Sequence, residues 1–262
     1  MSRTSRTIGA VALLALIGAA AAWALLSGDG SDESAAGQGP VPRAASSNPV
    51  DGPPASDRRL RLPGGGQPII WLRHGAEVAL RDAPGGELVE RLHSRTEFGS
   101  PTVLAVFRRV GRWAGVPTPL LANGDLGWVK LDPARLRAGQ TPYSVDVDLS
   151  QRRAQLLRGD RVTRSFTVTV GAPGSTTPTG RFAVTDTFRG NLNPAYGCCA
   201  VATTARQPNL PSGWLGGNRI AIHGTTGPLG VAASHGCVRA ADDDVNALVN
   251  HAAPGAPVVI RQ

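Results

Sequence analysis

The chain has 262 residues, 41% of them hydrophobic and 18% charged, with 33 glycines and 21 prolines. This length allows one or two modest domains, and so many turn-forming residues disfavour an all-helical fold. The formal net charge of +8 comes almost wholly from arginine, because Lys130 is the single lysine. A basic chain suits nucleic acid, a lipid surface or a cell-wall polymer, and net charge alone does not choose among these partners.

The first 26 residues have the pattern of an export signal. Arg3 and Arg6 precede an uncharged apolar run over residues 8–26, and polar residues follow. Nineteen residues nearly match the roughly 20 that cross a bilayer, and the flanking arginines place the N-terminus inside. Cleavage after an Ala-x-Ala pattern within residues 19–24 competes with retention as a single-pass membrane anchor, which we slightly favour. We therefore expect an extracytoplasmic protein, in the periplasm or cell wall, with no nucleic-acid partner.

Residues 27–67 are rich in Gly, Pro, Ser and Ala and almost free of large apolar side chains. Such a segment cannot bury enough surface to offset its ordering entropy. We expect a disordered linker that holds the folded part away from the membrane.

Residues 68–135 predict a small all-β domain, because short apolar runs recur there between Gly, Pro and Asn residues. Its segment RWAGVPTPLLANGDLGWV predicts a strand, a loop ending in Asn123-Gly124, and a second strand. This order resembles a bacterial SH3-like β-barrel, which implies a possible cell-wall ligand. Trp113 and Trp128 are candidates for lining a ligand groove, although aromatic residues in so small a barrel usually fill its core.

Residues 141–262 predict a second β-rich domain. Alternating patterns over SVDVDL, RAQLL and RVTRSFTVTVG indicate three successive strands, and TPTGRFAVTD indicates a turn and another strand. A short helix is expected behind the acidic run 242–244, with Val245, Leu248 and Val249 on one face. A last strand is expected over residues 257–260.

The segment IAIHGTTGPLGVAASHGCVR holds the candidate catalytic residues, His223 and Cys237. An imidazole near a cysteine can take its proton or stabilise the thiolate, which makes a nucleophile for acyl transfer. Spacing alone leaves open whether the intervening loop brings them together, and a metal site or a buried structural cysteine are the alternatives. A zinc site is disfavoured because Cys-x-x-Cys and His-x-x-x-His spacings are absent.

The IHG segment, a loop-length spacer and SHGCVR together resemble the active-site signature of the YkuD-type L,D-transpeptidases, and TPTGRF resembles a second segment of that family. The resemblance implies a mainly β fold: a YkuD-type β-sandwich with a short helix after the catalytic cysteine, here preceded by the SH3-like barrel. It implies that Cys237 is the nucleophile and His223 the general base, oriented through a backbone carbonyl at Gly224. His235 would face the site and assist substrate or oxyanion binding.

Other residues of SHGCVR take roles from the same resemblance. Backbone N–H groups around Gly236 and Cys237 would form the oxyanion hole. Ser234 would stabilise the loop, and Arg239 would either hold the loop, which we favour, or meet a substrate carboxylate. Ala240 and Ala241 depart from the Asn or Met common after the family's arginine, which puts the neighbouring contacts in doubt.

The implied reaction acts on peptidoglycan stem peptides and needs no metal or organic cofactor. The thiolate attacks the carbonyl between the third, L-centred residue and the terminal D-residue of a tetrapeptide, and an amine of a second stem peptide accepts the acyl group. Water as acceptor would give an L,D-carboxypeptidase, and a protein lysine would give an anchoring enzyme. A sortase-like cysteine acyltransferase and a non-catalytic wall-binding protein are the competing hypotheses.

Cys198 and Cys199 are adjacent, and adjacent cysteines rarely bridge each other because the ring is strained. We expect either thiols, as buried small side chains, or a reversible redox effect.

Overall fold

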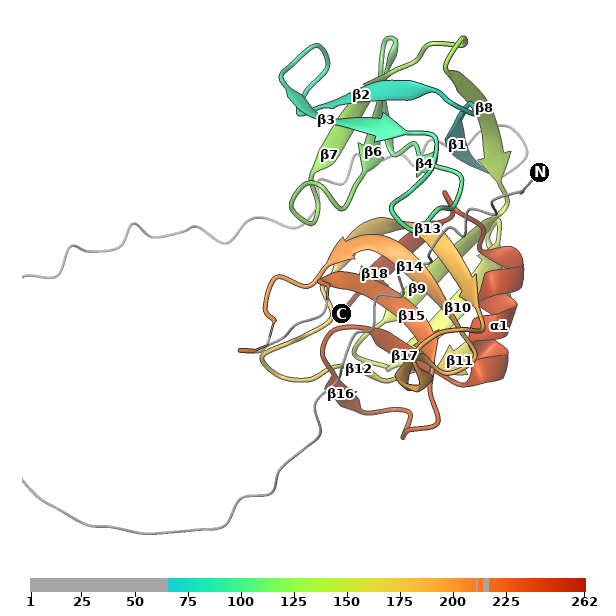
Figure 1. Ribbon diagram of the computed structural model, residues 1–262. Coiled ribbons are helices and arrows are strands. Elements are labelled where there is room, and N and C mark those ends of the chain that lie inside the picture. Colours follow the sequence, from blue (N-terminus) through green and yellow to red (C-terminus); the bar gives the residue numbers. More distant parts are fainter. Residues whose placement is uncertain (1–65, 211, 214–216) are drawn as a thin grey trace, which may run out of the picture. The chain divides into compact units, whose positions relative to one another are not determined.

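The computed structural model describes residues 66–210, 212–213 and 217–262, all within one compact unit, Pro53–Gln262 (Figure 1). The described chain is mainly β, with one α-helix, which confirms the expected fold class. The predicted export segment, and the predicted linker except for its last two residues, lie outside the described residues. Within the described residues, no helix is long and apolar enough to cross a membrane.

The part of the chain before Tyr143 forms two sheets of its own. A five-stranded sheet has the order β3-β2-β7-β6-β5, and a three-stranded sheet has the order β4-β1-β8. Their alternating apolar residues, among them Ile70, Leu80 and Val129, meet in a separate core cluster. The strands are β1 (Gln67–Leu72), β2 (Glu77–Arg81), β3 (Leu88–His93), β4 (Val103–Ala105), β5 (Arg108–Val110), β6 (Trp113–Pro117), β7 (Leu126–Lys130) and β8 (Leu136–Thr141).

The strand, loop and strand predicted around Asn123-Gly124 are confirmed as the antiparallel pair β6 and β7. Asp125 N–H donates to the carbonyl of Ala122 at 3.1 Å, and Gly124 has φ +99°, which closes the turn at the end of this loop. Trp128 is buried, whereas Trp113 is half-buried. The likeness of this region to an SH3 domain stays a prediction.

The remainder of the chain folds around an eight-stranded sheet of order β11-β10-β9-β18-β13-β14-β15-β17, and β12 and β16 form a separate parallel pair. The three strands expected before the TPTGRF segment are confirmed as β9, β10 and β11. The elements are β9 (Tyr143–Asp148), β10 (Arg153–Arg158), β11 (Arg161–Thr167), β12 (Val170–Gly171), β13 (Gly180–Arg189), a 3-10 turn (Pro194–Tyr196), β14 (Cys199–Arg206), β15 (Arg219–Gly224), β16 (Ala232–Ser234), β17 (Val238–Ala240), α1 (Asp242–His251) and β18 (Pro257–Arg261).

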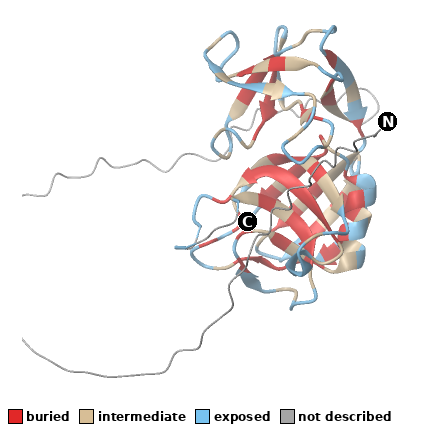
Figure 2. Ribbon diagram, in the orientation of Figure 1, coloured by how far each residue is buried: buried red, intermediate tan, exposed pale blue. Residues whose placement is uncertain are grey.

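The long strand β13 joins two halves of this sheet. Its first residues pair with β18 and its later residues pair with β14, with an irregularity between Val184 and Asp186. A strand that bends at a bulge can pass from one layer of a sandwich to the other. Both halves contribute to one core, in which Val147 and Leu156 come from one half and Ile222 and Val238 from the other. Figure 2 shows this buried interior along the strands.

The helix α1 closes the core beside β14 and β15. Asp242, Asp243 and Asp244 occupy its first turn, where carboxylates complement the positive end of the helix dipole. The predicted face of Val245, Leu248 and Val249 is buried, as expected. The helix and the strand after it are therefore confirmed.

Candidate active site

The nucleophile candidate and the base candidate lie on neighbouring parallel strands. In the ladder between β15 and β17, Ile222 pairs with Val238 and His223 pairs with Arg239. Side chains alternate between faces along a strand, so Ile222 and Val238 enter the core while His223 and Arg239 take the other face. Cys237, two residues before Arg239, lies on that same face. The 13-residue loop thus returns Cys237 to the strand that carries His223.

The sulfur of Cys237 is held against the backbone of β15. The N–H of Ala221 points at Cys237 Sγ at 3.5 Å, and the carbonyl oxygen of Arg219 lies 3.9 Å from the same sulfur. Cys237 is half-buried and is the free cysteine among the described residues. Burial raises the pKa of its thiol, and the Ala221 N–H and the charge of Arg239 oppose this shift in part. The thiol form therefore predominates at neutral pH.

His223 is fixed by its own chain. Its Nδ1 lies 2.8 Å from the carbonyl oxygen of Gly224, so Nδ1 carries the proton in the neutral ring and Nε2 keeps a lone pair. Only 4% of the residue is exposed. Burial lowers the pKa of His223, while the hydrogen bond with Gly224 opposes the shift and Arg239 adds to it. With a neutral imidazole and a neutral thiol, the two side chains do not form an ion pair before the reaction. His223 would then act as a general base that takes the thiol proton during attack.

The turn before Cys237 is built by Ser234 and Gly236. Ser234 Oγ accepts a hydrogen bond from Gly236 N–H at 3.1 Å and donates to the carbonyl of Cys237 at 2.5 Å. Gly236 has φ +113°, a conformation that side-chain-bearing residues rarely adopt. Ser234 is fully buried, so its hydroxyl shapes the loop instead of facing solvent.

Gln207 is a residue at this site that the sequence analysis missed. It is 3% exposed, and its Nε2 donates to the carbonyls of Ser175, Thr176 and His235 at 3.0–3.1 Å. A Cβ on Gly236 would lie 2.2 Å from that nitrogen. Gln207 therefore ties the nucleophile turn to residues 175–176. No motif pointed to it, since a single glutamine after a strand carries no spacing signal.

Thr177 adds a second tie between the TPTGRF segment and the same turn. Its Oγ1 donates to the carbonyl of Gly236 at 2.8 Å and accepts from Gly171 N–H at 2.9 Å. The second family-like segment is thus in direct contact with the cysteine loop.

Tyr196 was also missed. Its ring packs edge-on against His223, with 4.8 Å between ring centroids. Burial raises the pKa of the Tyr196 phenol, and the nearby Cys237 raises it further. A phenol kept neutral at this position can donate a hydrogen bond. Tyr196 stands two residues before Cys198, where no sequence motif marks the tyrosine.

The two remaining predicted site residues have different surroundings. The backbone N–H of Arg239 donates to the carbonyl of Thr169, and the N–H of Thr169 donates to the carbonyl of Arg239, each at 2.8 Å. The buried Nε of Arg239 has no hydrogen-bond partner among the described residues. The side chain of His235 is exposed, and its carbonyl accepts the hydrogen bond from Gln207. No cluster of three or more His, Cys, Asp or Glu side chains suited to a metal occurs among the described residues.

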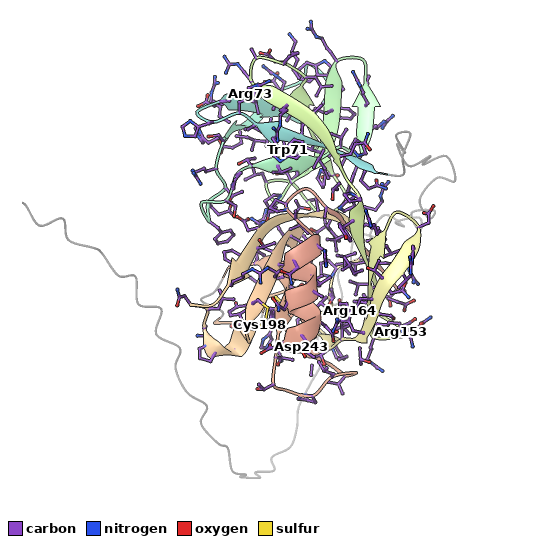
Figure 3. The ribbon with its side chains drawn as sticks, turned by 90° about the vertical axis from the view of Figure 1, so that its right-hand side faces the viewer. Trp71, Arg73, Arg153, Arg164, Cys198 and Asp243 are labelled. Carbon is purple, nitrogen blue, oxygen red and sulfur yellow. A yellow bond between two sulfur atoms is a disulfide. The ribbon has the colours of Figure 1, made fainter. Side chains whose placement is uncertain are left out.

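The expectation of free thiols at Cys198 and Cys199 is wrong, because these residues form a disulfide. The chain reverses just before them at Gly197, which has φ +62°. This reversal turns both sulfurs toward the first turn of α1, where they lie 3.4 and 4.0 Å from the carbonyl oxygen of Asp242 (Figure 3). Cys198 N–H also donates to Asp242 Oδ1 at 3.2 Å. The disulfide thus packs against the N-terminal end of α1.

Comparison with known proteins finds relatives among the L,D-transpeptidases. Residues 142–260 match the family model of the L,D-transpeptidase catalytic domain, YkuD. These matches support a YkuD-type L,D-transpeptidase catalytic domain. The chain is 30% identical over 128 residues to a Bacillus licheniformis protein named L,D-transpeptidase YkuD, a match that covers 45% of this chain and 66% of that protein.

One further relative carries the same name, and a solved structure of an L,D-transpeptidase also aligns with the chain. The Bacillus subtilis protein of that name is 28% identical over 127 residues, 46% of this chain and 67% of that protein. A solved L,D-transpeptidase structure from Mycobacterium tuberculosis aligns with a TM-score of 0.38 at 17% identity, covering 53% of this chain and 72% of that chain. The chain thus spans about two thirds of the length of these YkuD relatives, and the similarity concerns the domain that holds His223 and Cys237.

Proposed function

We propose that this protein is a peptidoglycan L,D-transpeptidase that works through a thioester on Cys237. The observation that carries the proposal is the placement of Cys237 and His223 on one face of adjacent strands, with His223 Nδ1 bound to the Gly224 carbonyl. This arrangement supplies a nucleophile and an oriented base, which is what acyl transfer by a thiol requires.

Acylation follows from the protonation states of the two groups. Cys237 Sγ attacks the carbonyl carbon of the third residue of the stem peptide. As it does so, the thiol proton passes to Nε2 of His223. The electron pair of the C=O bond moves to oxygen and forms a tetrahedral oxyanion. When the oxyanion collapses, the C–N bond breaks, the leaving amine of the D-residue takes the proton from Nε2, and a thioester remains on Cys237.

Transfer repeats these steps in reverse order. The amine of a second stem peptide attacks the thioester carbonyl, His223 takes a proton from that amine, and Cys237 leaves as the thiol when the proton returns to sulfur. Water at the same position would give carboxypeptidase activity, and a lysine of another protein would give anchoring. The transpeptidase outcome rests on the likeness of residues 142–260 to the YkuD family.

Stabilisation of the oxyanion is assigned to two donors. The Gly236 N–H already donates to Ser234 Oγ, so we assign the backbone role to Cys237 N–H and propose the Tyr196 hydroxyl as a second donor. Loss of one such donor typically costs about 3–4 kcal/mol of transition-state stabilisation. Arg239 is proposed to hold the cysteine loop through its two backbone hydrogen bonds with Thr169, and contact with a carboxylate of the substrate is the alternative.

The cellular context is part of the proposal. The positive, apolar and polar succession in residues 1–26 supports export with or without retention in the membrane. Residues 27–67 would then act as a linker, residues 68–135 as an SH3-like wall-binding domain, and residues 141–262 as the catalytic domain. Peptidoglycan lies outside the cytoplasm, where this order would put the catalytic cysteine.

The test uses the purified full chain and a disaccharide tetrapeptide, with products identified by mass spectrometry. We expect a crosslinked dimer together with the released D-residue. Cys237→Ala should abolish both this reaction and acylation of the protein by a carbapenem, while its thermal unfolding midpoint stays within a few degrees of the parent. Carbapenem acylation retained in Cys237→Ala would overturn the assignment.

Other products would select the rival functions. Release of the D-residue without a dimer would indicate a carboxypeptidase. Cleavage of a sortase-type peptide with no reaction on the tetrapeptide would indicate a sortase-like enzyme. Binding of peptidoglycan without any turnover would indicate a non-catalytic wall-binding protein.

A further inference from the structure

A cavity of about 540 Å³ lies between the strands that precede Tyr143 and the sheet that carries the active site. One wall comes from residues 91–120, and the other comes from β13, β14 and β15. This volume falls within the range of pockets that hold small molecules and short peptide segments.

The cavity has fixed edges. At one edge, the Asn123 side chain makes two hydrogen bonds with the backbone of Arg206, at 2.6 and 2.9 Å. At another edge, Thr96 Oγ1 donates to the buried Asp186 Oδ1 at 2.5 Å, and Glu97 forms an ion pair with Arg219. Side chains far apart in the sequence thus hold both walls in place.

The charge that lines the cavity is positive. Four arginines and one carboxylate face it: Arg91, Arg95, Arg206, Arg219 and Glu97. Arg219 is offset by Glu97 and by nearby Asp186, and Arg91 pairs with Glu77. Within the described ranges, Arg95 and Arg206 have no ion pair. Arg95 donates to the carbonyl of Gly99 at 2.6 Å, and Arg206 donates to the side-chain oxygen of Asn218 at 2.9 and 3.1 Å, but none of these partners carries a charge. The positive charges of Arg95 and Arg206 are therefore not neutralised within the cavity.

The remaining wall mixes aliphatic residues with threonines, His93 and Asn218. It includes Leu92, Val103, Leu104 and Leu120, and none of the described lining residues is Phe, Tyr or Trp. Leu120 is 44% exposed, which is high for a leucine in a folded domain. A cavity with aliphatic parts and two guanidinium groups outside any ion pair suits a peptide that carries carboxylates, because the remaining N–H groups of a guanidinium form charge-assisted hydrogen bonds with a carboxylate.

The strand β15 leads from the cavity toward the thiol. Arg219 lines the cavity, and Ala221 and His223 follow on the same face of the strand. The carbonyl of Arg219 and the N–H of Ala221 are the two backbone groups beside Cys237 Sγ. Alternate residues of a strand are about 6.6–6.8 Å apart, so an extended peptide covers the distance from thiol to cavity in about two to four residues.

We propose that this cavity binds a carboxylate-bearing stretch of the same peptide that Cys237 attacks, at least two residues from the scissile carbonyl, through Arg95 and Arg206. This inference rests on the proposed function and extends it by naming the chemistry of the distal subsite. Binding energy gained in the cavity would hold the reacting carbonyl next to the thiol. Contacts far from the reacting bond can accelerate a reaction in this way.

The test measures equilibrium binding by calorimetry to the full chain carrying Cys237→Ala, so that no turnover occurs. The probes are the disaccharide tetrapeptide with free side-chain carboxylates and the same compound with those carboxylates amidated. We expect Arg95→Gln combined with Arg206→Gln to weaken binding of the carboxylate form at least tenfold and to change binding of the amidated form less than twofold. Arg153→Gln, on the exposed part of β10, is the matched control and should change neither dissociation constant.

Equal weakening of both peptide forms, or no weakening of either in a double variant with an unchanged unfolding midpoint, would overturn the inference. Preference of the cavity for a peptide-free glycan or a phosphate-bearing wall polymer would also overturn it, by assigning the cavity to another class of ligand. Failure of the proposed function looks different, because the unmodified protein would then not turn over the tetrapeptide even if the charge-dependent binding were present.

Discussion

His223 Nδ1 lies 2.8 Å from the carbonyl oxygen of Gly224, the next residue of the chain. A base oriented by its own backbone needs no carboxylate partner, and Nε2 is left to take the proton of Cys237. Any change in the path of Gly224 should therefore act on the base directly. A Cβ on Gly224 would lie 2.1 Å from Asp242 Oδ1, so α1 and the active-site strand are packed tightly there.

The acylation rate should depend on pH through His223. Its pKa is lowered by burial below the ordinary 6.5, so the neutral base is present at neutral pH and is lost only as the pH falls through that lowered value. We expect carbapenem acylation, measured by intact-protein mass spectrometry, to be level through neutral pH and to fall only in acid, below the pKa of an ordinary imidazole.

The pKa of the Cys237 thiol is shifted upward, whereas the pKa of His223 is shifted downward. Because burial raises the pKa of Cys237 above 9.0, alkylation by a small neutral reagent should still increase with pH beyond that value. A thiolate that titrates below pH 7 would contradict the general-base mechanism. His251→Gln, a change at an exposed histidine, should leave both profiles unaltered.

Gln207→Leu should both destabilise the protein and slow acylation. The change leaves up to three carbonyls, those of Ser175, Thr176 and His235, without their donor. Each buried unsatisfied group costs about 1–3 kcal/mol, and we expect a total loss of about 3 kcal/mol in urea unfolding, with acylation slowed more than tenfold under native conditions. Gln151→Leu, at an exposed glutamine, is the control, and an equal loss in that variant would refute the role of Gln207.

Gly236→Ala should cost more stability than Gly159→Ala. Both glycines have positive φ, +113° and +60°, but a Cβ at Gly159 meets nothing within 4 Å, whereas one at Gly236 meets Gln207 Nε2 at 2.2 Å. We expect Gly159→Ala, the control, to lower the free energy of unfolding by about 1–2 kcal/mol because of its backbone conformation alone. The loss for Gly236→Ala should be clearly larger. Equal losses in denaturant unfolding would show that the turn has room for a side chain.

Reduction of the Cys198–Cys199 disulfide should change the free energy of unfolding only slightly. Cross-linking two adjacent residues removes little chain entropy from the unfolded state, on the order of 1 kcal/mol. Unfolding in urea with and without a phosphine reductant measures the difference. The double variant Cys198→Ala, Cys199→Ala should not respond to the reductant, and a loss above about 3 kcal/mol on reduction of the parent would contradict the entropy argument.

Local patterns were sufficient for most secondary structure. Alternation over residues 143–171 gave three strands in order, and the acidic run before Val245 gave the start of α1. The disulfide was missed because the sequence shows only that the two cysteines are adjacent, whereas the position of both sulfurs depends on the turn at Gly197 and on packing against α1. Gln207 and Tyr196 were missed because each reaches the site from a distant segment.

The sequence by itself determined the types of chemical group at the site and the alternation that puts Cys237, His223 and Arg239 on one face of their strands. Only the tertiary structure decided that β15 and β17 are adjacent, in which register they pair, and that Gln207 is bound to the nucleophile turn. It also decided that the pKa of His223 falls and that of Cys237 rises, so that both groups are neutral at neutral pH. The physical reason is that alternation is a property of one strand, whereas burial, register and clamping depend on segments that meet only when the chain folds.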